Sequence, residues 1–298
     1  MPEPEARAEE LATRVARDGF ALLRGLLPAE ELASLRGEIL VLCRDHGWLR
    51  EGAPLEEGIA ADHIADLAPV LGVGISQQAY QALQRMESFH RLGHHPALLE
   101  RVAELVGAGQ LVHPQKIARV MLPAQENAPT PAHQDYVFVQ GCRETYTCWV
   151  PLSDCPRALG TLSLLPGSHR IGVLPMEPAR GAGRRRALLP SDRPGSPAEG
   201  NGWIDWDLRA GDVVVFHSMC VHRSLPNTTR RIRLSVDYRY QSAREPVCEE
   251  ALHPHGRILD WEEIYAGWRR ADLQYYWRDC ELQAVARDES LLRTVQDA

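Results

Sequence analysis

Six short segments between residues 116 and 240 constrain the fold of this chain more than any other feature of its sequence. Each is rich in β-branched or aromatic residues and is bounded by Gly, Pro, Asp or Asn, which is the pattern of strands between turns. No helix-length segment connects them, which favours antiparallel pairing. We therefore expect a sandwich or barrel with strands at 117–122, 145–152, 161–165, 203–208, 213–217 and 232–240.

Helical patterns flank these strands on both sides. On the N-terminal side, apolar spacing predicts helices at 5–17, 28–44, 77–92 and 96–106, with a short strand at 20–24.

The tail, 245–298, returns to a helical pattern and carries several Trp and Tyr residues, for which packing is the simplest interpretation. The predicted fold class is mainly β with flanking α. We expect one domain over 1–298, with a β core at about 116–240 and a helical shell at 5–107 and 250–298.

Residues 176–202 interrupt the strands with prolines, glycines and a basic run at 184–186. A segment with so little apolar material buries too little surface to offset its ordering entropy, so we predict a long flexible insertion. It is either a lid at the barrel mouth or a surface insertion without a role. In a lid, the three arginines would favour an acidic or phosphorylated substrate; a solvated run is the alternative.

Bulk composition excludes several classes of function. Hydrophobic residues make up 44% and charged residues 24%, as in a soluble globular protein, and the net charge of −7 favours neither nucleic acid nor an anionic membrane surface. The start of the chain lacks the features of a signal peptide, and no apolar stretch is long enough to span a bilayer. Seven cysteines without a CxxC pair indicate free thiols in a reducing cytoplasm. Monomer and homo-oligomer both remain open.

The pair His133 and Asp135 carries the strongest chemical signal. Residues two apart on a strand point to the same side, so an imidazole and a carboxylate would converge on one point. A third ligand would complete a 2-His-1-carboxylate face, which holds non-haem Fe(II) and leaves positions open for oxygen chemistry. A later stretch offers His217 or His222, the second of which lies 87 positions after Asp135.

Read together, these stretches resemble the phytanoyl-CoA dioxygenase family of Fe(II)- and 2-oxoglutarate-dependent oxygenases. The similarity runs in the same order over about 18–240, and its motifs are jointly quite specific. The resemblance implies a double-stranded β-helix (jelly-roll) core with the metal near one mouth. It rests on Asp18-Gly-Phe-Ala-Leu-Leu, His133-Gln-Asp135, Trp149-Val-Pro-Leu-Ser-Asp154, Pro166-Gly-Ser-His-Arg170, and Gly211-Asp through His222-x-Ser224 to Arg233.

The family pattern implies that His222, rather than His217, completes the iron site. 2-Oxoglutarate would take two of the remaining metal positions and O2 the last. The far carboxylate of 2-oxoglutarate requires a planar bidentate cation, and Arg233 is that residue type, eleven positions after His222. Ser224 would add a hydroxyl donor.

Other positions near the motifs have two interpretations each. Trp149 either flanks the cosubstrate or belongs to the core. Gln115 and Lys116 either line the 2-oxoglutarate end or begin a surface strand. Cys148 and Cys220 neighbour the site in sequence, but buried small hydrophobic residues are the simpler interpretation.

The predicted function is oxidation of a small molecule with release of succinate and CO2. Halogenases of this kind replace the carboxylate ligand with a small residue, so Asp135 favours a hydroxylase. The alternatives are a cupin-like metal enzyme that does not use 2-oxoglutarate, which Arg233 and Ser224 argue against, and a non-catalytic small-molecule binding protein. A composition rich in Ala, Arg, Leu and Gly suggests a bacterial specialised metabolite as substrate.

Overall fold

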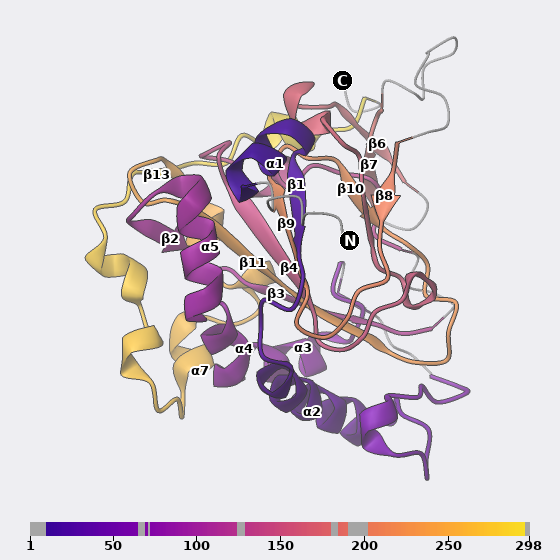
Figure 1. The fold of residues 1–298 in the computed structure, drawn as a ribbon. Helices are drawn as coiled ribbons and strands as arrows, with labels where there is room; N and C mark the ends of the chain where they lie inside the picture. The colour runs from indigo at the N-terminus through magenta and orange to yellow at the C-terminus, as the bar shows by residue number, and fades with distance from the viewer. Residues whose placement is uncertain are drawn as a thin grey trace, which may run out of the picture.

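Two antiparallel sheets form the centre of the computed structural model, which describes residues 10–64, 69–70, 72–123, 129–179, 184–189 and 202–295 (Figure 1). The larger sheet has the strand order β1-β9-β4-β11-β2, and β3 also pairs with β11. Its strands are β1 (Phe20–Leu23), β2 (Gln110–Val112), β3 (Ile117–Met121), β4 (Tyr146–Pro151), β9 (Val213–His217) and β11 (Arg233–Ser242).

The smaller sheet has three short strands in the order β10-β5-β8. Side chains of both sheets meet in one apolar cluster that includes Phe20, Trp149, Leu162, Leu164 and Phe216. The two sheets therefore enclose a common interior, as in a sandwich. The strands are β5 (Leu162–Leu164), β8 (Ile204–Asp205) and β10 (His222–Ser224).

Strand β11 shows how the interior is divided. Its even-numbered residues from Leu234 to Tyr240 belong to the cluster under the helices, so its odd-numbered residues point into the space between the sheets. Those inward residues are all polar, and four of the five are charged or carry an amide. They are Arg233, Ser235, Asp237, Arg239 and Gln241, and all five are buried.

Helices cover the outer face of the larger sheet (Figure 1). The Tyr238 and Tyr240 hydroxyls tie the sheet to this layer by donating hydrogen bonds to the carbonyls of Phe89 and Gly93, at 2.7 and 2.8 Å. The helices are α1 (Leu11–Asp18), α2 (Ala29–Asp45), α3 (Gln77–Gln84), α4 (Glu87–Leu92) and α5 (Pro96–Val106).

The predicted helices and strands on the N-terminal side agree with these bounds except at two places. The predicted helix at 77–92 is two helices, because the chain leaves helical geometry at Met86 (φ −69°, ψ 111°). Residues 5–9 of the first predicted helix lie outside the described part.

The C-terminal segment is less helical than predicted. Within the described residues it contains one short α-helix, α7 (Trp261–Tyr265), several 3-10 turns, and a parallel pair of β12 (Val247–Cys248) with β13 (Ala284–Val285). Gly256 and Gly267 adopt positive φ angles that end helical runs. The aromatic residues pack on one another around Trp261, as expected for packing.

Two described parts of the segment 176–202 form a β-hairpin of β6 (Met176–Pro178) and β7 (Arg185–Ala187). Met176, Ala187 and Leu189 are buried in a cluster with Ala132 and Val221. These few apolar residues are enough to order the hairpin, because it packs on the surface formed by the rest of the protein and does not need a core of its own. Residues 180–183 and 190–201 lie outside the described part, so the prediction of a flexible lid stays a prediction.

No helix in the described ranges has the length and apolar character needed to cross a membrane. The seven cysteines are free, and six are buried. Burial raises the pKa of the Cys220 thiol to about 12 and that of Cys148 further, so both behave as small apolar side chains.

Candidate functional site

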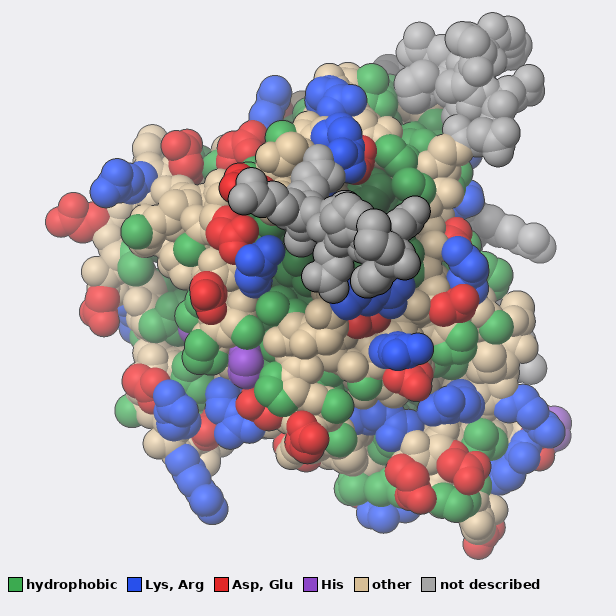
Figure 2. Space-filling view, in the orientation of Figure 1, with side chains coloured by type: hydrophobic (Ala, Val, Ile, Leu, Met, Phe, Trp, Pro, Cys, Tyr) green, Lys and Arg blue, Asp and Glu red, His purple; other side chains and the backbone are tan. Residues whose placement is uncertain are grey.

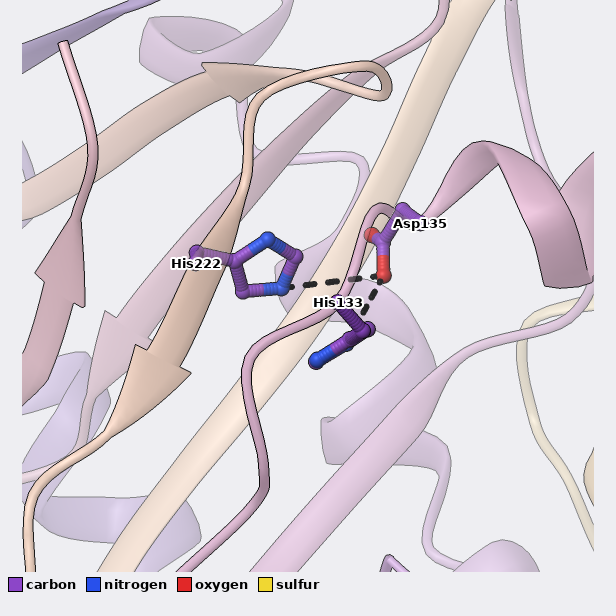
Figure 3. A group of neighbouring side chains, drawn as sticks. All are labelled: His133, Asp135 and His222. Atoms are coloured by element: carbon purple, nitrogen blue, oxygen red, sulfur yellow. Dashed lines mark ion pairs between the residues drawn. The ribbon is translucent and has the colours of Figure 1, made fainter. Parts of the chain in front are cut away.

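His133 and His222 lie opposite each other in an antiparallel bridge between the two stretches that the sequence singled out. The backbone N–H of each donates to the carbonyl of the other at 3.0 Å. The side chains of His133, Asp135 and His222 converge on one point (Figure 3), and their ligand atoms all lie within 4.8 Å of one another. All three residues are buried.

Asp135 reaches this point differently from the prediction. It does not continue a strand from His133, because its backbone is already helical (φ −60°, ψ −32°) and it caps the short helix α6 (Tyr136–Val139). The turn into the helix brings the carboxylate back toward both imidazoles. Asp135 Oδ1 lies 3.6 Å from His133 Nε2 and 3.8 Å from His222 Nε2 (Figure 3).

The geometry and donor set fit a first-row divalent ion. Two ligands that each lie about 2.1 Å from an ion are at most about 4.2 Å apart, and both distances from Asp135 Oδ1 to the imidazole nitrogens meet this limit. His133 Nδ1 lies 2.8 Å from the carbonyl of Pro131, and His222 Nδ1 lies 3.0 Å from the carbonyl of Cys220. Each Nδ1–H therefore donates to a carbonyl, which leaves the Nε2 lone pair free for a metal.

The second oxygen of Asp135 is fully engaged. Oδ2 accepts hydrogen bonds from Thr147 Oγ1 at 2.7 Å and from Arg239 Nε at 3.0 Å, and Arg239 Nη2 is also 3.0 Å away. Thr147 and Arg239 are direct partners across β4 and β11, so both point inward at the same level. Only Oδ1 is left to coordinate an ion.

Thr147 and Arg239 were missed by the sequence analysis. Their signal is the period-two alternation of polar residues within strands that are otherwise apolar, which marks an inward polar row. Recognising their partner required knowing the strand register.

The electrostatics favour the protonation states that a metal requires. Burial by itself would raise the pKa of Asp135, but Arg239 and then the two imidazoles outweigh it and hold the pKa well below its usual range. Burial, assisted by His133, lowers the pKa of His222 to about 3. At neutral pH the site therefore presents a carboxylate and a neutral imidazole at these two positions.

His217 is not part of the site, in agreement with the family pattern. On β9 it shares the parity of Val213 and Val215, whose side chains lie in the outer core, and so it points away from the interior. Its Nε2 lies 3.2 Å from Glu144, and its Nδ1 accepts from the N–H of Met219 at 3.0 Å.

The Pro166-Gly-Ser-His-Arg170 turn holds the segment before His222 in place. Ser168 Oγ accepts from the N–H of Val221 at 2.8 Å and donates to the carbonyl of Leu165 at 2.6 Å. The turn also contacts the Asp18-Gly19 motif, since the N–H of Gly167 donates to the carbonyl of Asp18 at 2.8 Å. These two motifs therefore position a ligand strand rather than contact substrate.

Arg233 lies on the same inward row of β11 as Arg239 and is 1% exposed. Its Nη1 donates to the carbonyl of Gly160 at 2.6 Å, whereas its Nε and Nη2 are buried and have no hydrogen-bond partner among the described residues. Burial lowers the pKa of this guanidinium to about 10, so it remains a cation at neutral pH. The Trp149 ring centroid lies 5.7 Å from it, and the indole Nε1 is likewise buried without a partner.

Trp149 belongs to the apolar cluster between the sheets and also adjoins Arg233, so its contact with the cosubstrate stays a prediction. Ser224 lies two residues after His222 on β10 and is buried. Its hydroxyl oxygen accepts from the N–H of Thr130 at 2.7 Å, which leaves the hydroxyl proton available for another acceptor.

A cavity of about 350 Å³ opens beside the triad. Its wall combines the apolar side chains of Ile117, Phe138 and Val139 with polar ones, including Gln115 and His255. Burial lowers the pKa of His255 to about 3, so this wall adds a neutral imidazole rather than a charge. The Gln115 amide also donates to the carbonyl of Glu250 at 3.0 Å.

Lys116 does not line the cavity. Its Nζ instead donates to the hydroxyl of Tyr276, in the C-terminal segment, at 3.1 Å. It is buried, and burial lowers its pKa to about 7. Its burial contradicts the alternative of a surface strand, and its contact with 2-oxoglutarate stays a prediction.

The phytanoyl-CoA dioxygenase (PhyH) family model matches residues 15–235. Among curated relatives, the 1-deoxypentalenic acid 11-beta-hydroxylase of Streptomyces exfoliatus is 24% identical over 251 residues, which cover 79% of this chain and 82% of that protein. The ectoine dioxygenase of Bordetella parapertussis is 28% identical over 255 residues, or 80% and 75% of the two chains.

Solved structures share the fold. The epimerase SnoN in complex with Fe3+, alpha ketoglutarate and nogalamycin RO aligns with a TM-score of 0.55 and 25% identity over 80% of this chain and 84% of its own. EvdO2 from Micromonospora carbonacea, complexed with 2-oxoglutarate, aligns with a TM-score of 0.51 and 22% identity over 80% and 92%. The predicted jelly-roll core is confirmed.

Proposed function

Because the chain belongs to the phytanoyl-CoA dioxygenase family of iron- and 2-oxoglutarate-dependent oxygenases, we propose that it hydroxylates a specialised metabolite in the cytoplasm. That it is such an oxygenase, acting on a small molecule with Fe(II), 2-oxoglutarate and O2, follows from the family and its relatives. Iron held in this site would supply the redox chemistry that couples O2 to the conversion of 2-oxoglutarate into succinate and CO2.

His133, Asp135 and His222 would hold the iron. The observation that carries this assignment is that only three ligand atoms are left free at the point of convergence, one on each residue. Every other polar atom of the three side chains already has a hydrogen-bond partner, which fixes the rings and the carboxylate before an ion arrives.

Arg233 would hold the far carboxylate of 2-oxoglutarate. Its two unpartnered donors, Nε and Nη2, lie on one edge of the guanidinium and match the two oxygens of a carboxylate. Buried polar atoms without partners are rare, so a cluster of them next to a buried cation fits an anion that brings its own acceptors. Trp149 and the Ser224 hydroxyl would add contacts from either side.

Hydroxylation is the outcome that Asp135 and the named relatives favour. The carboxylate occupies the position that a halogenase would leave for chloride, and the curated relatives include a hydroxylase and a dioxygenase. Structural neighbours on the same fold include an epimerase and a carbocyclase, so the final oxidation depends on where the cavity places the substrate. The hydroxylase from Streptomyces and the epimerase from nogalamycin biosynthesis support a specialised metabolite as substrate.

The test uses purified protein loaded with Fe(II) under nitrogen. Adding 2-oxoglutarate should produce the visible charge-transfer band of a chelated keto acid, and admitting air should release succinate. Candidate metabolites are then screened for stimulated succinate release and for a product heavier by one oxygen atom. Absence of the band with wild-type protein would contradict the proposed use of 2-oxoglutarate.

A further inference from the structure

The charges that line the cavity beside the triad are mostly neutralised within the protein. Asp135 and Arg239 pair at the metal end, and each of three further charged wall residues has a partner of opposite charge. Those pairs are Arg119 with Asp237, Arg287 with Glu289, and Glu250 with Arg257, at 2.7, 2.7 and 2.8 Å.

Two arginines of the wall are left over. The guanidinium of Arg184 is half-buried and donates to the carbonyl of Pro129 at 2.6 Å, and no carboxylate faces it in the described part of the chain. Arg185 is exposed at the cavity, with no hydrogen bond or ion pair to any described residue. The described residues of the wall therefore carry an excess of about two positive charges.

The third arginine of the run provides an internal contrast. Arg186 forms an ion pair with Glu177 across the β6–β7 hairpin and does not line the cavity. Adjacent residues of one strand thus differ in environment, because strand geometry separates them.

The hairpin holds Arg184 and Arg185 close to the metal ligands. The N–H of Ala187 donates at 2.7 Å to the carbonyl of Ala132, the residue before His133, and the N–H of Leu188 donates at 2.8 Å to the carbonyl of Pro175. The arginines are therefore placed by a docked strand pair rather than by a free loop.

The rest of the molecule does not share this excess. The chain has a net charge of −7, and on the face seen in Figure 2 acidic and basic side chains are intermixed. A protein that is acidic overall but positive at one cavity concentrates anions there.

We propose that Arg184 and Arg185 bind an anionic group of the substrate, a carboxylate or a phosphate, while its apolar body lies along Ile117, Phe138 and Val139. The inference rests on the proposed function, since it assigns a substrate class to the same cavity. Phe138 lies at the junction, with its ring centroid 5.8 Å from that of His133, so the apolar body passes next to the metal ligands.

The test measures binding to the full chain loaded with Fe(II) and saturating 2-oxoglutarate under nitrogen. The probes are decanoate, decyl phosphate and the uncharged methyl decanoate, and isothermal titration calorimetry reports their dissociation constants. One anionic probe at least should bind about tenfold or more tightly than methyl decanoate, and added salt should reduce that preference. The better anion identifies the group.

Three variants then locate the charge. Arg185→Gln and Arg184→Gln should each weaken the anionic probe by about tenfold and leave methyl decanoate unchanged. Arg186→Gln, the matched control, should leave both unchanged. Arg185→Gln is the decisive variant, because this side chain has no hydrogen bond or ion pair to a described residue that its replacement would break.

Equal binding of charged and uncharged probes, no binding of any anion, or equal effects of Arg185→Gln and Arg186→Gln would overturn the proposal. The charge-transfer band is recorded in every sample. Its presence shows that the 2-oxoglutarate site is intact, so a failure of the substrate assignment is distinguished from a failure of the proposed function.

Discussion

The two ends of the inward row of β11 differ in how completely the protein satisfies its own polar atoms. At the Arg239 end, the imidazole Nδ1 atoms and the second oxygen of Asp135 all have partners. At the Arg233 end, four buried groups have no partner in the part of the chain that the structure describes: two guanidinium nitrogens, the Trp149 indole nitrogen and the Ser235 hydroxyl.

The difference reflects what each end receives. A metal cation brings no hydrogen-bonding groups, so the protein must complete the ligands' hydrogen bonds by itself. A dicarboxylate brings acceptors, so donors left unpaired in its absence become paired when it binds. The metal-ligating side chains are therefore hydrogen-bonded before an ion binds, whereas the donors at the Arg233 end become hydrogen-bonded only when 2-oxoglutarate binds.

The largest expected effect is the loss of turnover when a metal ligand is removed at the Arg239 end of the row. Asp135→Ala removes a ligand, so substrate oxidation should fall below detection. It also leaves the buried Arg239 without its carboxylate, so the thermal unfolding midpoint should fall while the circular dichroism spectrum remains that of a folded protein. Turnover and circular dichroism are measured on the same preparation. Substantial turnover in a folded Asp135→Ala protein would refute the ligand assignment.

At the other end of the row, Arg233→Ala should raise the KM for 2-oxoglutarate by about two orders of magnitude, because a charge-assisted bidentate contact is worth a few kcal/mol. The KM for the prime substrate should change much less. Arg230→Ala, at an exposed arginine whose partner is the surface residue Asp62, is the control. Equal losses for both substrates would show Arg233 to be structural.

A smaller effect on Fe(II) affinity is expected for residues that hold a metal ligand in place without coordinating the metal. Arg239→Gln leaves all three ligands in place but removes the charge beside Asp135 Oδ2, so Fe(II) affinity should fall by about 10- to 100-fold. Thr147→Val should reduce it less, since it removes one neutral hydrogen bond. Metal titrations of both variants give the affinities. An unchanged dissociation constant for Arg239→Gln would show that Arg239 does not support metal binding.

The smallest effect concerns His113, whose Nε2 lies 2.9 Å from the amide oxygen of Gln241, at the end of the row beyond Arg239. Its Nδ1 is buried without a hydrogen-bond partner among the described residues. Burial lowers the pKa of His113 to about 3. Below about pH 6.5 its imidazole is therefore protonated in the unfolded chain but stays neutral in the folded protein. Stability should thus decline as the pH falls from 6.5 toward 3, by at most about 1.4 kcal/mol per pH unit from this residue.

Denaturant titrations across that range, on wild type and His113→Gln, measure the slope. The variant should lose stability less steeply as the pH falls, whereas His63→Gln at an exposed histidine should follow the wild type. Parallel curves for wild type and His113→Gln would show that water reaches this end of the row.

How much could be read from the sequence depended on the range of the interactions involved. The strands around 146–151 and 213–217 and the helix at 29–45 follow from local alternation and apolar spacing, and they were predicted nearly to the residue. The choice of His222 over His217 came from the family pattern, and strand parity on β9 explains it afterwards.

The parts that were missed depend on pairing between distant residues. Arg239 and Thr147 are 92 positions apart and meet at Asp135 only because β4 and β11 adopt one particular register. The hairpin that carries Arg184 likewise depends on residues outside its own segment, because it docks on Ala132. The same holds for Lys116, whose partner Tyr276 lies in the C-terminal segment.

The backbone bridge between His133 and His222 has a consequence for the order of events during folding. Its two residues are far apart in the chain, so this contact closes a large loop and forms only when both sheets have assembled. A nascent or partly unfolded chain therefore has no complete site for iron, and a redox-active metal is held only once the surrounding protein is in place. Iron uptake during refolding would report completion of the native state, after the helices and local turns have formed.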